Sequence, residues 1–241
     1  FEAVLDLILK NDNKIIALAR SEDKLQRLFE IATSLNPKCK LYPIKFDIVH
    51  DDYISYLVPF VTECFGQVDV LINNAGTLIN KPFEQLSTLD FAEMLQNNLL
   101  GHVKIIQHLL PLMKAGSHIL NIGSMGGFQG SIKFPGLAAY SASKAAMTAF
   151  FESVRLDMLD TGVSVTIIQP GFIKTPLTSG RTHKMPFVME LDDAIPLFVN
   201  AIEKKKRFSA FPWQLATIVR AGRLMPAWLY DRIAGGANYR S

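Results

Sequence analysis

The stretch Val70-Leu71-Ile72-Asn73-Asn74-Ala75-Gly76 decides the fold of this 241-residue chain. Its apolar part belongs to the run Val68–Ile72, which is typical of a parallel strand buried on both faces. Amide and small residues follow the run directly. A parallel sheet presents backbone amides to a ligand at this position, the carboxyl end of a strand. The sequence therefore predicts a ligand-binding turn after Ile72.

Strand-like and helix-like segments alternate on both sides of this stretch, as in βαβ units on a parallel sheet. We therefore predict an α/β fold with a doubly wound parallel sheet, Rossmann-like and three-layered (α/β/α). The predicted strands are Lys14–Ala19, Leu41–Phe46, Val68–Ile72, His118–Ile122, Val163–Ile168 and Phe208–Phe211. The predicted helices are Phe1–Asn11, Asp23–Leu35 with Ser21 as its cap, Asp51–Phe65, Leu89–Met113, Ala138–Leu159 and Asp192–Lys204.

The start of the chain departs from a complete dinucleotide-binding fold, which begins with a strand and a glycine-rich turn. No glycine cluster occurs before Gly66, and the chain opens in a helical pattern. We therefore expect the first strand and its glycine-rich turn to be absent from this sequence. The expected domains are an N-terminally incomplete catalytic domain over residues 1–212 and a helical appendage over residues 213–241.

Composition excludes several classes of function. The net charge of +3 is too small and too dispersed for a nucleic-acid-binding protein. The two cysteines and five histidines show no metal-ligand spacing, so we predict no metal site. No apolar run reaches the roughly 18 residues of a membrane span, and no signal peptide is evident. These observations favour a cytoplasmic protein.

The pair Tyr140 and Lys144 carries the strongest chemical signal. Residues four apart share one face of a helix, so both side chains point into the same space. A free phenol has a pKa near 10, and a neighbouring ammonium stabilises the phenolate. Tyr140 is therefore the predicted proton donor or acceptor.

Further turn and hydroxyl residues follow other predicted strands. Ser124 follows the strand His118–Ile122, whereas Pro170, Gly171 and Thr175 follow the strand Val163–Ile168. Carboxyl ends of parallel strands meet at one edge of a sheet, so these residues are expected near Tyr140. A serine hydrolase is excluded, because Ile122 occupies the first glycine position of the G-x-S-x-G motif around Ser124.

Together, the residues Asn73–Gly76, Asn98, Ser124, Tyr140, Lys144 and Pro170-Gly171 resemble the short-chain dehydrogenase/reductase family, over about residues 1–211. The resemblance implies that Tyr140 is the general acid or base, that Lys144 binds the nicotinamide ribose, and that Ser124 binds the substrate oxygen. It implies a water held by Asn98 in a proton relay. It also implies cofactor contacts from Asp47, Asn73, Ala75, Gly76, Pro170, Gly171, Ile173 and Thr175. The loop from Ser124 to Tyr140 is longer than is common in the family, which leaves Ser131 as a less favoured substitute for Ser124.

The end of the strand Lys14–Ala19 indicates which nicotinamide cofactor is used. An acidic residue at this position binds the ribose 2′-hydroxyl of NAD, whereas an arginine accommodates the 2′-phosphate of NADP. The chain has Ala19, Arg20 and Ser21 there. Arginine pairs with phosphate through two parallel hydrogen bonds. The sequence therefore predicts NADP(H).

The expected substrate is a hydrophobic aldehyde, ketone or secondary alcohol, because Pro170–Pro186 and the C-terminal tail are apolar with few polar groups. The tail is expected to pack over the pocket or a partner subunit, and membrane contact is a less favoured alternative. The family resemblance implies a homodimer or homotetramer, with Met113, Met147, Phe150, Phe151 and Met158 as contact or core residues. The alternative function is that of a cofactor-binding or regulatory protein without catalysis. Epimerase or dehydratase chemistry is less favoured, because such enzymes usually carry a larger substrate domain, for which this chain has no room.

Overall fold

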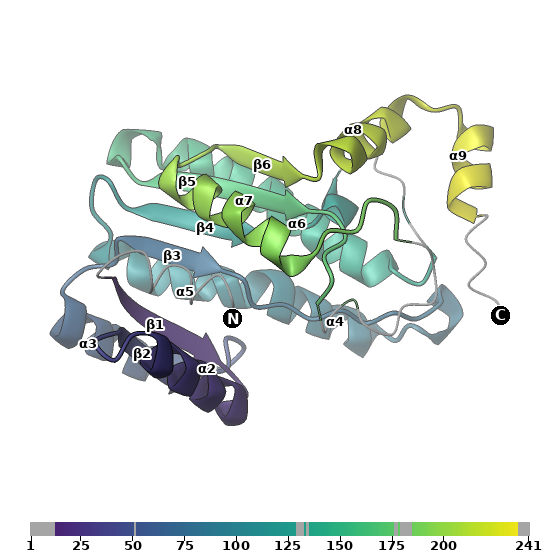
Figure 1. The fold of residues 1–241 in the computed structure, drawn as a ribbon. Coiled ribbons are helices and arrows are strands. Elements are labelled where there is room, and N and C mark those ends of the chain that lie inside the picture. Colours follow the sequence, from purple (N-terminus) through teal and green to yellow (C-terminus); the bar gives the residue numbers. More distant parts are fainter. Residues whose placement is uncertain are drawn as a thin grey trace. The chain divides into compact units, whose positions relative to one another are not determined.

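The computed structural model describes residues 13–50, 52–128, 133, 135–175, 178 and 185–235 (Figure 1). The predicted helix Phe1–Asn11 and the alternative serine, Ser131, lie outside these described residues. The chain divides into two compact units, Phe1–Phe60 and Val61–Ser241.

The first unit is a βαβ arrangement. Strand β1 (Lys14–Ala19) pairs in parallel with strand β2 (Lys40–Lys45), and helix α2 (Glu22–Leu35) connects them. Ser21 caps α2 as predicted, because its hydroxyl accepts a hydrogen bond from the backbone N–H of Lys24 at 3.4 Å. A small apolar cluster of Leu28, Ala32 and Leu41 joins the helix to the strands.

The prediction that the first strand is absent is not supported. The described residues open with a strand, β1, which pairs with β2 along its whole length. The prediction rested on a missing glycine-rich turn. Such a turn serves a ligand, whereas a strand needs only an extended backbone and a hydrogen-bonding partner.

The described strands fall into two sheets, β1-β2 and β3-β4-β5-β6, and both are parallel.

The second unit contains the four-stranded sheet. Its strands lie in sequence order, and each pairs only in parallel with its neighbours. Within the sheet Ile119 lies beside Leu71 on one side and Val165 on the other. The carboxyl ends of all four strands therefore lie at one edge. The strands are β3 (Val70–Asn73), β4 (His118–Ile122), β5 (Ser164–Pro170) and β6 (Phe208–Phe211).

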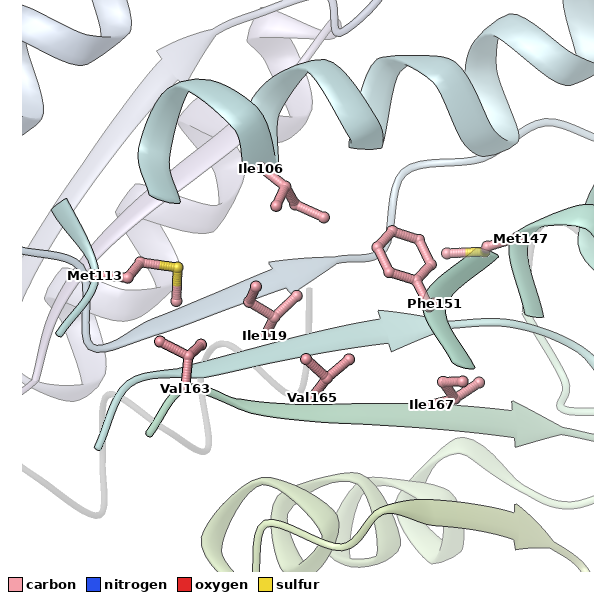
Figure 2. Packing of buried hydrophobic residues seen from close by; sticks show 8 residues of the cluster. All are labelled: Ile106, Met113, Ile119, Met147, Phe151, Val163, Val165 and Ile167. Carbon is pink, nitrogen blue, oxygen red and sulfur yellow. The ribbon is translucent and has the colours of Figure 1, made fainter. Parts of the chain in front are cut away.

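Helices cover both faces of this sheet, because neighbouring residues of a strand point to opposite faces. Ile119, Val165 and Ile167 pack against helices α5 (Gly101–Leu109) and α6 (Ala138–Asp157) (Figure 2). Leu120 and Ile168 pack instead in a cluster with helix α7 (Leu191–Glu203). The second unit is thus the predicted three-layer α/β/α arrangement.

Three side chains considered as contact or core residues belong to the core. Met113, Met147 and Phe151 are buried in the cluster between the sheet and helices α5 and α6 (Figure 2). Phe150, by contrast, is 38% exposed. Met158 is partly buried and packs against the same cluster. Phe150 is therefore the most exposed of the five residues.

Strand β3 is less buried than predicted. Val70 and Ile72 are 44% and 38% exposed, whereas a strand covered on both faces would bury them. Among the described strands β3 pairs only with β4, so it lies at the edge of its sheet. An edge strand keeps more of its surface in contact with solvent.

The predicted helix Leu89–Met113 is one unbroken helical run, but its type changes along its length. It consists of α4 (Thr88–Leu95), a π-helical turn (Gln96–Leu100), α5 and a short 3₁₀ turn (Leu110–Leu112). A π turn inserts one extra residue per turn and occurs often at functional sites. Apolar periodicity does not reveal such an insertion, because the helical face is interrupted for only one turn.

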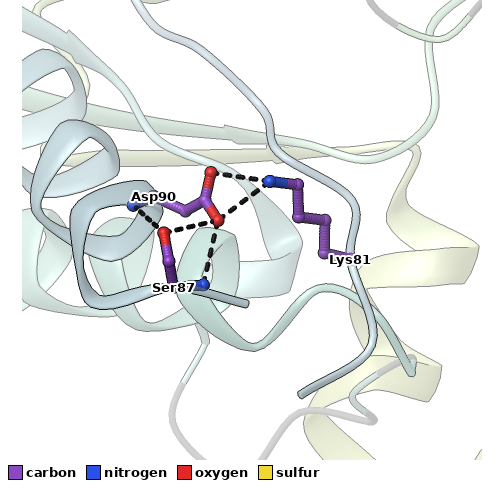
Figure 3. A network of polar contacts seen from close by, with 3 residues as sticks. All are labelled: Lys81, Ser87 and Asp90. Atoms are coloured by element: carbon purple, nitrogen blue, oxygen red, sulfur yellow. Dashed lines mark hydrogen bonds and ion pairs between the residues drawn. The ribbon is translucent and has the colours of Figure 1, made fainter. Parts of the chain in front are cut away.

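The start of α4 is fixed by a capping box. Ser87 accepts a hydrogen bond from the N–H of Asp90 at 3.0 Å, and the Asp90 carboxylate accepts one from the N–H of Ser87 at 2.9 Å (Figure 3). Lys81 donates to both oxygens of Asp90, at 2.8 and 2.9 Å. These partners, Lys81 first, lower the pKa of Asp90 to about 2. The box sets the register of the helical stretch that leads to Asn98.

The described residues end with two short helices, α8 (Trp213–Ala221) and α9 (Ala227–Gly235), separated at Pro226. Of the helices in the described part of the chain, none is both long and apolar enough to cross a membrane.

Candidate active site

Tyr140 and Lys144 lie on the first turns of α6, at the carboxyl edge of the four-stranded sheet. Lys144 is buried, and its Nζ donates a hydrogen bond to the carbonyl of Ile122 at 2.9 Å. Ile122 is the last residue of β4, so this bond fixes the ammonium at the end of the strand. Burial lowers the pKa of Lys144 to about 8. Tyr140 is partly exposed.

Ser124 lies beside Tyr140, as predicted. A β-carbon on Gly126 would lie 3.5 Å from Ser124 Oγ and 3.7 Å from Tyr140 Cε1, so both side chains contact the same point. The Ser124 hydroxyl accepts a hydrogen bond from the N–H of Gly126 at 3.1 Å. A hydroxyl has one proton and two lone pairs, so Ser124 keeps its proton to donate elsewhere.

The turn after Ser124 packs directly on α6. This turn, Met125–Gly127, is a single turn of 3₁₀ helix, which we call the Ser124 turn. A β-carbon on Gly127 would lie 2.6 Å from the carbonyl carbon and oxygen of Lys144. Only glycine permits this approach of two backbones. The contact fixes the position of Ser124 relative to α6, the helix that carries Tyr140.

Asn98 joins the turn after β3 to α6. It is fully buried in the π turn, where its Oδ1 accepts from the N–H of Thr77 at 2.8 Å. Its Nδ2 donates to the carbonyl of Thr77 and to Ser143 Oγ, both at 3.0 Å. Ser143 in turn donates to the carbonyl of Tyr140 at 2.8 Å. The Asn98 side chain is thus occupied by protein partners, and the water relay remains a prediction.

Gly76 brings the turn after β3 to the lysine. A β-carbon there would lie 3.0 Å from Asn98 Oδ1 and 3.7 Å from Lys144 Nζ. Asn74, Ala75 and Gly76 are exposed among the residues that the structure describes. The structure therefore brings the predicted residues Gly76, Asn98 and Lys144 together beside an open surface.

Asn73 lies differently from the prediction that it lines the cofactor. Its side chain is buried, and its Nδ2 donates to Asn121 Oδ1 in β4 at 2.7 Å. Asn73 thus fastens the end of β3 to β4 from within the sheet. The exposed backbone of Ala75 and Gly76 is the part of this turn that faces solvent.

His102 is a site residue that the sequence analysis missed. It is buried in α5, and its Nε2 lies 2.8 Å from the carbonyl of Ala75. A carbonyl only accepts, so Nε2 carries a proton. The ring is neutral near pH 7 because its pKa is lowered. Burial above all, with the nearby charge of Lys144, lowers the pKa of His102 to about 4. The sequence did hold a signal for His102: it lies four residues after Asn98, a spacing that places the two residues on one helical face.

The predicted residues after β5 lie beside the C-terminal helix α8. The N–H of Gly171 donates to the carbonyl of Phe211 at 2.9 Å, and a β-carbon on Gly171 would overlap Leu215. The side chain of Ile173 is buried in the α7 cluster, so only its backbone is available to a ligand. The N–H of Thr175 donates to Thr178 Oγ1 at 3.0 Å. Pro170 ends β5 and is partly exposed.

Three predicted cofactor residues belong to the first unit. Arg20 directly follows β1 and is exposed. Ser21 is the cap of α2. Asp47 follows β2, and its Oδ1 accepts from the N–H of Val49 at 3.0 Å. In the described part of the chain, no three His, Cys, Asp or Glu residues gather where they could hold a metal ion.

Known proteins resemble this chain over most of its length. The family model for short chain dehydrogenases matches residues 2–186. An uncharacterized oxidoreductase of Myxococcus xanthus is 32% identical over 223 residues, which cover 92% of this chain and 86% of the relative. Sulfoacetaldehyde reductase 2 of Chromohalobacter salexigens is 32% identical over 161 residues, 65% of this chain and 63% of that protein.

A solved structure agrees with the fold. A short-chain dehydrogenase from Streptomyces avermitilis superposes with a TM-score of 0.76 at 21% identity and covers 98% of this chain and 95% of its own. The parallel sheets, the site at the carboxyl edge of the four-stranded sheet and the match to the family model lead to one assignment. The chain belongs to the short-chain dehydrogenase/reductase family of oxidoreductases.

Proposed function

We propose that this protein transfers a hydride between NADP(H) and the carbonyl or alcohol carbon of a hydrophobic substrate. The observation that carries the proposal is the convergence of Ser124, Tyr140 and Lys144 at the carboxyl end of β4. A carbonyl that is being reduced needs a proton for its oxygen and hydrogen bonds for the charge that develops there. The three side chains supply both.

Tyr140 is the proposed proton donor in the reduction. Its hydroxyl proton passes to the substrate oxygen, and the electrons of that O–H bond remain on the phenolate. The buried ammonium of Lys144, four residues along the same helix, stabilises the phenolate. In the oxidation the phenolate takes the proton back.

Ser124 is the proposed donor to the substrate oxygen. Its lone pair is engaged by the N–H of Gly126 at 3.1 Å, which directs the hydroxyl proton away from the turn. A positioned hydroxyl donor stabilises the oxygen as negative charge develops on it. Asn98 and Ser143 act indirectly, because they hold the backbone of Thr77 and Tyr140.

The residues present fit a nicotinamide dinucleotide. A β-carbon on Gly76 would lie only 3.0 Å from Asn98 Oδ1, and the turn Asn74–Gly76 exposes its backbone to a ligand. The same β-carbon position is 3.7 Å from the buried Lys144 Nζ, so a ribose bound over this turn would lie next to the ammonium. When bound, the reduced cofactor supplies the hydride to the carbonyl carbon. NADP(H) rather than NAD(H) is proposed from the exposed Arg20 at the end of β1 and from the lack of an acid at Ala19.

A hydrophobic substrate is proposed from the surroundings of the Ser124 turn. Met125, which follows Ser124, packs in an apolar cluster with Leu215 and Val219 of α8, and Phe128 and Phe172 border it. The relative named sulfoacetaldehyde reductase supports an aldehyde as the reacting group. The C-terminal helices, residues 213–235 of the described chain, are the proposed wall of the substrate site.

A homodimer or homotetramer is proposed from the outer surface of α6. Phe150 and Leu156 are 38% and 57% exposed on this helix, and Leu159 just beyond it is 64% exposed. Apolar side chains gathered on one surface helix favour burial against another subunit. Light scattering on the purified protein would give its mass, and a monomer at micromolar concentration would contradict this assembly.

The proposed activity is tested by NADPH oxidation over a panel of aldehydes and ketones. Wild type is expected to turn over apolar members, and Tyr140→Phe to lose at least about a hundredfold in kcat. The exposed Tyr56 provides the matched control, Tyr56→Phe, which keeps wild-type activity. If NADPH raises Tm but no carbonyl is reduced, the protein is a cofactor-binding protein without this catalysis. Equal activity of Tyr140→Phe and wild type would contradict the mechanism.

A further inference from the structure

Lys133 holds the end of the Ser124 turn. Its Nζ donates to the carbonyls of Gly126 and Phe128, at 2.7 and 2.9 Å. An ammonium that donates to two neighbouring carbonyls fixes the direction of both peptide groups. Lys133 is half-buried, and burial lowers its pKa, so the two carbonyls offset part of the cost of its desolvation. The lysine therefore restrains the turn that begins at Ser124.

The backbone of the same lysine is joined to the last helix. The N–H of Lys133 donates to the hydroxyl of Tyr230 at 2.8 Å, and Tyr230 lies on α9. Lys133 thus connects the two segments: its backbone bonds to α9, and its side chain bonds to the Ser124 turn. We call these three hydrogen bonds the Lys133 bridge.

Helix α8 contacts the same segment independently. The guanidinium of Arg220 lies 5.3 Å from the ring centre of Phe128 and 5.4 Å from that of Phe208. Met125 of the turn packs against Leu215 in the cluster described above. Cation–π and apolar contacts of this kind stabilise a relative position without fixing a hydrogen-bond direction.

We propose that the Lys133 bridge makes Lys133 and Tyr230 positioning residues, through which the C-terminal helix α9 holds Ser124 in place for the substrate oxygen. The structural half of this proposal, coupling between α9 and the Ser124 turn, needs no catalysis. The kinetic half rests on the proposed carbonyl reduction. A misplacement of about 1 Å in a catalytic group lowers rates by up to about a hundredfold, so a weakened bridge is expected to be measurable.

Amide hydrogen exchange tests the structural half. The N–H groups of Gly126, Gly127 and Phe128 bond to Ser124 Oγ, Ser124 O and Met125 O, and they report on the turn. The N–H of Tyr230 bonds to the carbonyl of Pro226 and reports on α9. Tyr230→Phe removes the acceptor and should speed exchange in the turn about fivefold, while Lys133→Met should speed exchange at Tyr230 by a similar factor.

The controls are Tyr56→Phe and Lys114→Met, which change exposed residues of the same types. Both controls should leave exchange in the turn and in α9 at the wild-type rates. If Tyr230→Phe leaves the turn unchanged, or Lys133→Met leaves α9 unchanged, the bridge does not couple the two segments and the proposal is overturned.

Kinetics test the second half with any carbonyl that the wild type reduces. Lys133→Met should lower kcat/KM for the carbonyl about tenfold and leave the Kd of NADPH within about twofold, because the bridge ends at the substrate donor. Lys133→Arg, which keeps a cationic donor, should recover most of the loss. An unchanged kcat/KM in Lys133→Met overturns the kinetic half. If the wild type reduces no carbonyl, the proposed function fails instead, and hydrogen exchange alone decides the bridge.

Discussion

The Asn98 side chain binds both backbone groups of Thr77: its Oδ1 accepts from the N–H at 2.8 Å, and its Nδ2 donates to the carbonyl at 3.0 Å. A carboxamide carries one acceptor and one donor group, so it pairs with a residue's backbone as a neighbouring strand would. The same Nδ2 also reaches Ser143 on α6. Through this pairing a buried side chain orders the exposed turn that ends at Gly76.

Asn98→Ala should lower the free energy of unfolding by about 2–4 kcal/mol, because it leaves backbone groups of Thr77 without their partners. Activity should fall further than stability explains, since the turn at Gly76 loses its support. Urea unfolding and steady-state NADPH oxidation measure the two effects. Asn97→Ala is the neighbouring control, because Asn97 donates only to Glu93 within its own helical stretch and should cost about 1 kcal/mol. Equal losses in both variants would contradict a special role for Asn98.

The pH dependence of activity should reflect Lys144. Burial lowers the pKa of its ammonium to about 8, so the cation that stabilises phenolate is lost as pH rises through that value. The value of kcat/KM for NADPH, which reports groups of the free enzyme, should therefore fall above about pH 8. Lys114→Met should show the same profile as wild type. A profile that stays flat from pH 7 to 9.5 would exclude this assignment.

Stability at acid pH should depend on His102. Its pKa is lowered to about 4 in the folded state, whereas the unfolded imidazole titrates near 6.5. Between these values only the unfolded chain binds the proton, so stability falls as pH drops, by about 3 kcal/mol in all. His102→Gln keeps an N–H donor for Ala75 and should flatten this part of the stability curve. The exposed His108 gives the control, His108→Gln, and an equally steep curve in His102→Gln would refute the account.

Two adjacent glycines should respond very differently to alanine. The Gly127 β-carbon would lie 2.6 Å from the Lys144 backbone, so Gly127→Ala must separate the Ser124 turn from α6. A loss of at least about 2 kcal/mol is expected from overpacking. Gly126→Ala places its methyl at ordinary contact distances, 3.5 Å and more, and should unfold like wild type. Thermal unfolding compares the two, and similar Tm values would contradict the packing described for Gly127.

Cofactor preference should change with Arg20. Arg20→Asp places a carboxylate where a 2′-phosphate is proposed to bind, and repulsion should raise the KM for NADPH at least about tenfold relative to NADH. Steady-state kinetics with both cofactors measure the ratio. Arg27→Asp, on α2 at an exposed position, controls for the general change of charge. An unchanged ratio in Arg20→Asp would remove the basis for NADP(H).

Much of the fold followed from local patterns. Strands β1, β4 and β6 begin and end where the apolar runs predicted, and Ser21 caps α2. Hydrophobic periodicity and caps are local signals, and each depends on few residues. The order of the chemistry-bearing residues along the chain also sufficed to place Ser124, Tyr140 and Lys144 at one sheet edge.

Tertiary structure alone decided the rest. The π turn around Asn98, the exposure of Val70 and Ile72, and the neutral His102 beneath Ala75 depend on partners far along the chain. The Lys133 bridge joins residues 97 positions apart, at a distance that no local pattern reports. A sequence specifies which side chains can donate, accept or pack. Which of them meet is fixed only when the layers pack together and most buried polar groups find hydrogen-bond partners.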